Sequence, residues 1–299
     1  AFFFNCACSV MPPSMPPPVS VEGDSGHFRI GQIIHLETGK AISLDELIEK
    51  LGRKELIFVG EVHDNPEHHL MQVQILQALM TRYNLLTVAM ELFQEPQQPI
   101  LDRYIAGAIT ESVFLRDVDW VQGWAYHYHL YRPIMLLTKE GGGETLAINA
   151  PRGIVRKVAR NGLGSLEPSE RNQLASDIDL GNEGHRTYLR KAYERHSHPD
   201  LKRFDYFYEA QCVWEDTMAE NIAEHLKRHR EKLVVLLGNG HIVNKFGVPN
   251  RTLSRIQVAA ATVLLQPLAS PTDIRKDSAD YIWLTRDCSG KKLMNHPTK

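Results

Sequence analysis

Residues 56–69 read LIFVGEVHDNPEHH, an apolar run that passes directly into a stretch rich in acids and histidines. A continuous apolar run of this length is typical of a β-strand that is covered on both faces. Asn65 and Pro66 then form a helix start signal, because asparagine caps helices and proline is favoured at the first helical position. The stretch therefore predicts a buried strand, a turn that carries titratable side chains, and a helix.

Strand and helix patterns alternate along the rest of the chain. Further strands are expected at 85–92, 145–152, 232–238, 256–266 and 280–285, and a long helix at about 203–230. The helix after Pro66 is expected to bury an apolar stripe that consists of Leu70, Val73, Leu76, Met80 and Tyr83. This alternation predicts an α/β fold with a mainly parallel central sheet flanked by helices, and a helical lobe inserted at about residues 96–210.

The first residues, AFFFNCACSVMPPSMPPPVS, join an apolar piece to cysteines and a proline-rich tract. Such a composition cannot pack a core, so residues 1–27 are expected to form a disordered leader and tether. Residues 28–299 would then form a single α/β domain. Cys8 follows the small residue Ala7 and is the candidate for a lipid anchor. With that anchor as its only membrane attachment, the domain is expected in the cell envelope, as a periplasmic or outer-membrane lipoprotein.

The composition excludes several classes of function. Hydrophobic residues make up 43%, charged residues 23%, and the net charge is −2, which predicts an ordinary globular domain without a nucleic-acid partner. No apolar segment reaches the roughly 18 residues that a membrane helix needs. The four cysteines match no zinc template, and the chain contains no C-x-x-C-H, no phosphate-binding glycine loop and no G-x-S-x-G.

Polar side chains follow the predicted strands at the points where they end. In open α/β sheets, ligands bind beyond the carboxyl ends of the strands. Two strands end in the same pattern, Gly-x-x-His, as GEVH at 60–63 and GNGH at 238–241. The residues expected to meet at this edge are Glu61, His63, Glu91 and His241, with Asp64, Asn149, Arg152 and Asn239 beside them.

Two acids and two imidazoles at one edge allow two interpretations. They could bind a divalent metal, with His63 and His241 as nitrogen ligands and Glu61 or Glu91 as an oxygen ligand, and the metal would activate water. They could instead form a buried hydrogen-bond network that holds the strand ends together. The residues alone leave both interpretations open.

Several motifs together resemble one known family. These are FVGEVHDNPEHH, AMELF, YRP, AINAPR, FYEAQCVWEDTMAENIA and VVLLGNGHI. They look like those of the ChaN-like family of bacterial haem-binding lipoproteins, which is related to the Tiki and TraB proteins and the erythromycin esterases. The resemblance runs from about residue 28 to 285. It implies an α/β core with a helical lobe, haem bound at a homodimer interface through a tyrosine, and a role in iron acquisition.

Two segments hold candidate haem ligands, and a tyrosinate suits ferric haem. The segment GWAYHYHLYRP, residues 123–133, carries Tyr128, His129 and Tyr131, and the long helix carries Tyr208 and Gln211. The sequence does not decide between Tyr131 and Tyr208 as the iron ligand. The tyrosines of the first segment are equally consistent with an aromatic helix face packed on the sheet.

Three functions follow from these observations. The first is a haem-binding protein of haem or iron uptake, whose site would be a broad apolar slot. The second, implied by the hydrolase and peptidase relatives, is a metal-dependent hydrolase in which Glu61, His63, Glu91 and His241 are catalytic. The third is a scaffold that uses the same residues only to hold the strands together. We expect the first.

Overall fold

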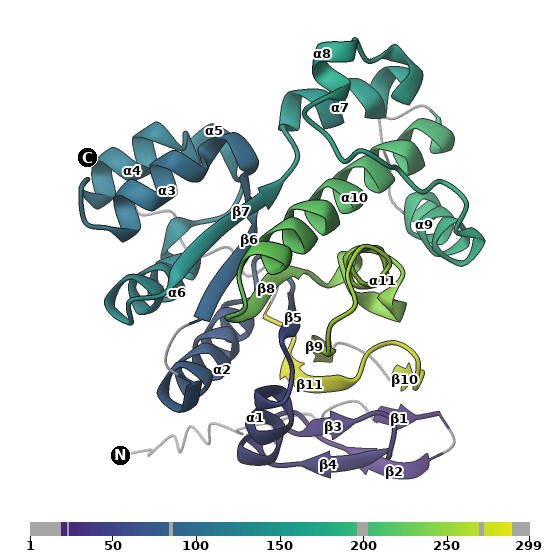
Figure 1. Cartoon of the computed structure of the whole chain (residues 1–299). Helices are drawn as coiled ribbons and strands as arrows, with labels where there is room; N and C mark the ends of the chain where they lie inside the picture. The colour runs from purple at the N-terminus through teal and green to yellow at the C-terminus, as the bar shows by residue number, and fades with distance from the viewer. Residues whose placement is uncertain (1–18, 23, 84–85, 196–202, 269–271, 289–299) are drawn as a thin grey trace, which may run out of the picture.

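The computed structural model describes residues 19–22, 24–83, 86–195, 203–268 and 272–288. A mainly parallel sheet lies at the centre of this part of the chain (Figure 1). Its eight strands run in the order β4-β3-β11-β9-β5-β8-β6-β7, and only β3 and β4 at one edge are antiparallel to their neighbours. Their bounds are β3 Ile33–His35, β4 Lys40–Ile42, β5 Leu56–Glu61, β6 Leu86–Gln94, β7 Glu144–Asn149, β8 Lys232–Gly238, β9 Ala260–Leu268 and β11 Tyr281–Arg286. The predicted fold class and the six long strands are confirmed.

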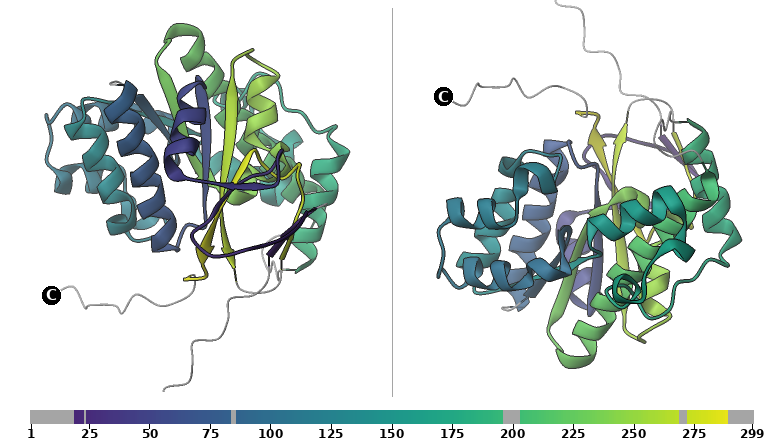
Figure 2. Two further views of the ribbon diagram at one scale, coloured as in Figure 1. Left: turned by 90° about the horizontal axis from the view of Figure 1, so that it is seen from below. Right: turned by 90° about the horizontal axis from the view of Figure 1, so that it is seen from above.

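The central strands bury alternate residues on opposite faces of the sheet. Ile57 and Val59 of β5 pack in one apolar cluster with α1 (Leu44–Gly52), α2 (Pro66–Tyr83) and α6 (Tyr128–Glu140). Leu56 and Phe58 pack in a second cluster on the other face, against α10 (Phe204–Arg228) and α11 (Val248–Leu253). Figure 2 shows the blue helices and the green helices on the two sides of the sheet. Because both faces are covered, β5 is apolar along its length.

The helical lobe expected at 96–210 is divided in two by a strand. β7 pairs with β6 in the sheet, and its residues Ala147 and Ile148 are buried there. Before it lie α3 (Gln98–Ile105), α4 (Glu111–Asp117), α5 (Trp120–Gly123) and α6. After it lie α7 (Arg152–Asn161), α8 (Pro168–Arg171) and α9 (Glu183–Arg195), which extend from the sheet together with the first half of α10 (Figure 1).

The predicted boundary of the tether is wrong. The tether was expected to reach residue 27, but β1 (Val19–Val21) pairs with β2 (Asp24–Phe28) and with β10 (Thr272–Ile274) in a small second sheet. Val19 and Val21 are buried there, so the alternation of this short strand supplies a packed face. Residues 1–18, with Cys8, lie outside the described residues, and the lipid anchor stays a prediction. None of the helices in the described ranges could cross a bilayer.

The buried face of α2 differs from the predicted stripe. Leu70 is 60% exposed and Tyr83 is 40% exposed, while His68, His69 and Gln72 are buried. The polar residues lie inward because they have partners there. His68 Nδ1 lies 2.8 Å from the backbone nitrogen of Val62, and its Nε2 lies 2.8 Å from Thr285 Oγ1. Hydrogen bonding to the strand ends therefore decides the rotation of this helix.

The rotation of α2 is tested by two alanine substitutions. Leu76 is fully buried, so Leu76→Ala should lower the free energy of unfolding by about 2–5 kcal/mol. Leu70→Ala is the matched control and should change it by less than about 0.5 kcal/mol. Urea denaturation followed by circular dichroism measures both. Equal losses at the two positions would contradict the observed orientation.

Candidate functional site

Glu61, His63, Glu91 and His241 meet at the carboxyl edge of the sheet, as the sequence predicted. Glu61 Oε1 lies 2.7 Å from His63 Nδ1. Glu91 Oε1 lies 4.0 Å from His63 Nε2 and 3.4 Å from His241 Nε2. The two carboxylates are nearly inaccessible to solvent, and His63 retains some exposure. β5 and β8 are in register with Glu61 opposite Gly238, which brings the two motifs together.

The glycine that opens each Gly-x-x-His motif makes room for a side chain of the other motif. A side-chain carbon at Gly238 would lie 2.9 Å from His63 Nε2, and one at Gly60 would lie 2.0 Å from Asn239 Oδ1. The Gly238 N–H also donates to Glu91 Oε2 at 2.6 Å. Glycine is therefore required here by the close approach of neighbouring groups.

Glu61 is held as a buried carboxylate by several donors. The Tyr131 hydroxyl donates to Oε1 and the Gln72 amide donates to Oε2, each at 2.8 Å. His69 Nδ1 lies 3.6 Å from Oε2. Burial alone would raise the pKa of Glu61, but His69, His63 and Gln72 together outweigh it and lower the pKa to about 2.

His241 lies between two carboxylates. Its Nδ1 is 2.9 Å from Glu215 Oε1, and its Nε2 faces Glu91. Burial opposes a charge on the imidazole, but Glu91 and Glu215 raise the pKa of His241 to about 10. Burial likewise opposes the charge of Glu215, and hydrogen bonds from His185 and His241 lower its pKa to about 2. An imidazolium bound by two carboxylates is the stable state of this group.

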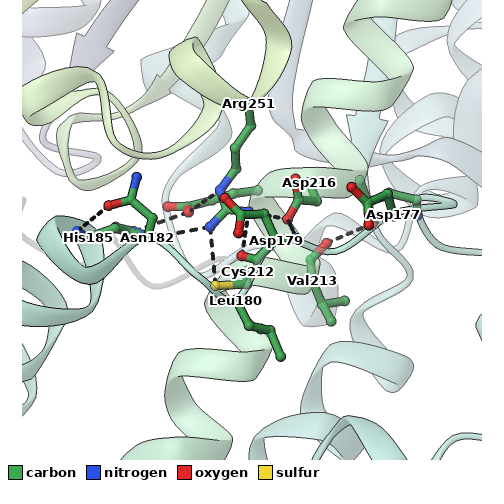
Figure 3. A network of polar contacts seen from close by, with 12 residues as sticks. Asp177, Asp179, Leu180, Asn182, His185, Cys212, Val213, Asp216 and Arg251 are labelled. Carbon is green, nitrogen blue, oxygen red and sulfur yellow. Dashed lines mark hydrogen bonds and ion pairs between the residues drawn. The ribbon is translucent and has the colours of Figure 1, made fainter. Parts of the chain in front are cut away.

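A second layer of buried polar groups supports Glu215. His185 Nε2 lies 3.2 Å and Arg251 Nε lies 3.4 Å from Glu215 Oε2. Figure 3 shows Arg251 reaching toward Asp216 and Cys212 of α10 and toward the segment that precedes α9. Its Nη1 donates to the carbonyl of Asp179 at 3.0 Å. Acids and bases thus alternate from Tyr131 to Arg251 through the interior.

The arrangement of these groups favours the network interpretation over the metal site. No group of three or more His, Cys, Asp or Glu side chains in the described ranges could hold a metal ion. His63 Nδ1 and both ring nitrogens of His241 each face a carboxylate. Burial would lower the pKa of His63, but Glu61 and Glu91 outweigh it and raise the pKa.

Two of the other residues predicted at this edge donate hydrogen bonds to backbone carbonyls of other strands. The Asn149 amide donates to the Glu91 carbonyl at 2.6 Å, and the Asn239 amide donates to the Leu265 carbonyl at 2.7 Å. Asp64 is partly buried on the turn between β5 and α2.

A pocket of about 290 Å³ adjoins the cluster between β6, β7, α7 and α10. Its walls are mainly apolar and include the rings of Trp124, Phe207 and Trp214. Trp124 packs edge-on against His63, with ring centroids 5.1 Å apart, and Trp214 packs edge-on against His241 at 5.5 Å. The charged cluster therefore supports two of the aromatic walls. Asn149, Arg152, Arg156 and Gln211 supply polar atoms to the same pocket.

The predicted tyrosine ligands are buried, and the hydroxyls of Tyr131 and Tyr208 are hydrogen-bonded. Burial, together with Glu61, raises the pKa of Tyr131. The Tyr208 hydroxyl donates to the carbonyls of Leu180 and Asn182, each at 3.3 Å, and burial raises its pKa as well. Burial raises the pKa of Tyr128, while His129 is exposed. Among the five predicted haem residues only Gln211 lines the pocket.

Tyr206 is a candidate that the sequence analysis missed. It is partly buried, and Arg203 Nη1 donates to its hydroxyl at 2.9 Å. The guanidinium of Arg203 also lies 4.3 Å from the centre of the ring. The sequence signal is an arginine three residues before a tyrosine at the start of a helix, whereas Tyr208 lies on the opposite face of that helix.

Residues 47–252 match the family model described as haem-binding uptake, Tiki superfamily, ChaN. Among solved structures the chain is similar to ChaN of Campylobacter jejuni, which binds haem cofacially; the TM-score is 0.65 and the identity 20%, over 89% of this chain and 98% of ChaN. It is also similar to the type III effector HopBA1, with a TM-score of 0.47 and 12% identity over 81% of this chain and 93% of the effector. It is similar as well to the erythromycin esterase EreC, with a TM-score of 0.46 and 11% identity over 79% of this chain and 76% of the esterase. No curated protein sequence matches the chain.

The buried charge of Glu61 predicts how stability depends on pH. Its folded pKa of about 2 lies below the usual 4.5, so its contribution is present above pH 4.5 and is lost as the pH falls towards 2. Glu61→Gln should remove about 3 kcal/mol of that pH dependence. Urea denaturation between pH 2 and 7 measures it.

The control is Glu95→Gln at an exposed position, which should leave the loss of stability at acid pH unchanged. The pKa of Glu215 is also lowered, so Glu61→Gln should reduce the loss of stability at acid pH without removing it. An unaltered slope in Glu61→Gln would show that the charge of Glu61 is not stabilised as described.

Proposed function

Because the chain belongs to the haem-binding ChaN family of the Tiki superfamily, we propose that it binds haem in the pocket between β6, β7, α7 and α10 and serves in haem or iron acquisition. The observation that carries this proposal is the set of aromatic walls, Trp124, Phe207 and Trp214, around a mainly apolar space. Haem is a flat ligand with a large apolar surface, and ligand pockets for such groups combine apolar walls with a few polar atoms.

One polar side chain of the pocket lining also has an unpaired buried atom. The Asn149 side chain is buried, and its Oδ1 has no hydrogen-bond partner among the described residues. A buried acceptor without a partner costs free energy of about 1–3 kcal/mol, and a bound ligand or water can satisfy it. Because ionised carboxylates only accept hydrogen bonds, a water molecule is the donor that would satisfy this oxygen.

For the iron ligand we propose Tyr206. The hydroxyls of Tyr131 and Tyr208 are buried and donate to acceptors, so ionising either one requires breaking a hydrogen bond. The Tyr206 hydroxyl instead accepts from Arg203, so ligation of iron does not require it to give up a donated hydrogen bond to the described residues. The Tyr206 ring packs beside Gly162, which follows the end of α7, the helix that carries the pocket residue Ala159; Tyr206 itself does not line the pocket.

The wider biological setting is part of the same proposal. A homodimer with haem at its interface agrees with the partly exposed position of Tyr206. A lipid anchor at Cys8 and a place in the cell envelope follow from the resemblance to the family. Sedimentation of the protein with and without haem tests the dimer, and the dimer fraction should rise on haem addition.

The haem site is tested by titrating ferric haem into the purified protein. Saturable binding with a tyrosinate-type absorption spectrum is expected. Tyr206→Phe should abolish that spectrum and weaken binding about ten-fold or more, because the iron loses its anionic ligand. Tyr131→Phe and Tyr208→Phe are the matched controls and should keep the spectrum.

Three other results would change the proposal. If Tyr208→Phe or Tyr131→Phe removes the spectrum and Tyr206→Phe does not, the iron ligand has been assigned to the wrong tyrosine. If all three variants keep it, ligation by tyrosine is wrong. If wild-type protein does not bind haem, the proposed function itself fails.

A further inference from the structure

Two arginines of α7 border the pocket without a bound acid. Arg152 and Arg156 are four residues apart, so they lie on the same face of the helix, and both line the pocket. Like charges at this spacing destabilise a helix by a few tenths of a kcal/mol. Within the described ranges neither guanidinium lies within ion-pair distance of a carboxylate, and Arg152 Nη1 donates only to the carbonyl of Gln122 at 2.8 Å.

The surroundings of Arg152 leave its charge incompletely compensated. Burial and then the charge of Arg156 lower the pKa of Arg152, and Asp119 opposes this from farther away. Other basic side chains of α7 are arranged differently: Lys157 donates to Glu170 at 2.6 Å, and Arg160, which is exposed as Arg156 is, does not line the pocket. The pocket thus holds two positive charges beside apolar walls, and an anion bound there would remove their repulsion.

The type of anion follows from the rest of the pocket. Residues four apart on a helix have Cβ atoms about 5–6 Å apart, so two separate carboxylates on one ligand can each reach one guanidinium. The apolar walls require that the remainder of the ligand be a large apolar body. A single small anion would leave those walls empty, and a hydrocarbon would leave the arginines unpaired.

We infer that Arg152 and Arg156 bind the two carboxylates of a dicarboxylate tetrapyrrole, so that these acids select the ligand in addition to the iron. This inference rests on the proposed function and extends it. Metal-free protoporphyrin should then bind in the same pocket, and tetrapyrroles whose carboxylates are esterified should bind more weakly.

The inference is tested by titrating four ligands into the full chain: haem, protoporphyrin and the dimethyl ester of each. Wild-type protein should bind both free acids, and each ester should bind about ten-fold more weakly or worse, because charge-assisted hydrogen bonds are lost. Arg156→Gln should weaken the free acids about ten-fold and leave the esters unchanged. The double variant Arg152→Gln/Arg156→Gln should bind acid and ester with equal affinity. Arg160→Gln on the same helix is the charge-matched control and should behave as wild type.

The possible outcomes separate this inference from the proposed function. If wild-type protein binds haem and its ester equally, the arginines do not bind the carboxylates and the inference is wrong, but the proposed haem-binding function is unaffected. If the double variant still prefers the free acids, the carboxylates bind elsewhere and the inference is wrong. If wild-type protein binds neither haem nor protoporphyrin, the proposed function has failed. Thermal unfolding of each variant reports whether the fold is intact, and Arg156→Lys should restore part of the preference for acids.

Discussion

The pairing of buried carboxylates with imidazoles is the constraint on which this structure depends. Glu61, Glu91 and Glu215 are almost completely removed from solvent, and each has at least one histidine within 4.0 Å. Removing one partner of such a pair leaves an uncompensated charge in the interior, which costs about 3–5 kcal/mol. The cluster therefore fixes the ends of β5, β6 and β8 and the middle of α10 as one unit.

The position of the pocket follows from this unit. Trp124 and Trp214 pack against the two histidines of the cluster, so the aromatic walls are held by groups that cannot move without breaking ion pairs. The Asn149 amide that reaches the Glu91 carbonyl adds a third connection. The cluster therefore has a clear structural role beside a ligand pocket, without any requirement that it perform chemistry. A preorganised pocket loses little free energy when a rigid, flat ligand binds.

The sequence predicted the features that local patterns determine. Continuous apolar runs located the six long strands, and the rule that parallel strands end at one edge brought Glu61, His63, Glu91 and His241 together. What it missed depends on distant partners. His185 and Arg251 join the network only because α9 and α11 pack against α10, and nothing in their own neighbourhoods indicates this. The face of α2 was misjudged for the same reason, since Gln72 lies inward to reach Glu61, eleven residues away. Tyrosines were chosen by their spacing, but accessibility is a property of the fold.

The two Gly-x-x-His motifs are interlocked. Each glycine is small because the opposite motif occupies the space next to it: Asn239 beside Gly60, and His63 beside Gly238. Neither glycine can be enlarged without moving a side chain of the opposite motif. A chimera that exchanged a single motif with a relative would inherit a steric conflict, whereas exchanging both together would preserve the fit. These two segments, about 180 residues apart in the chain, therefore have to evolve as a single element.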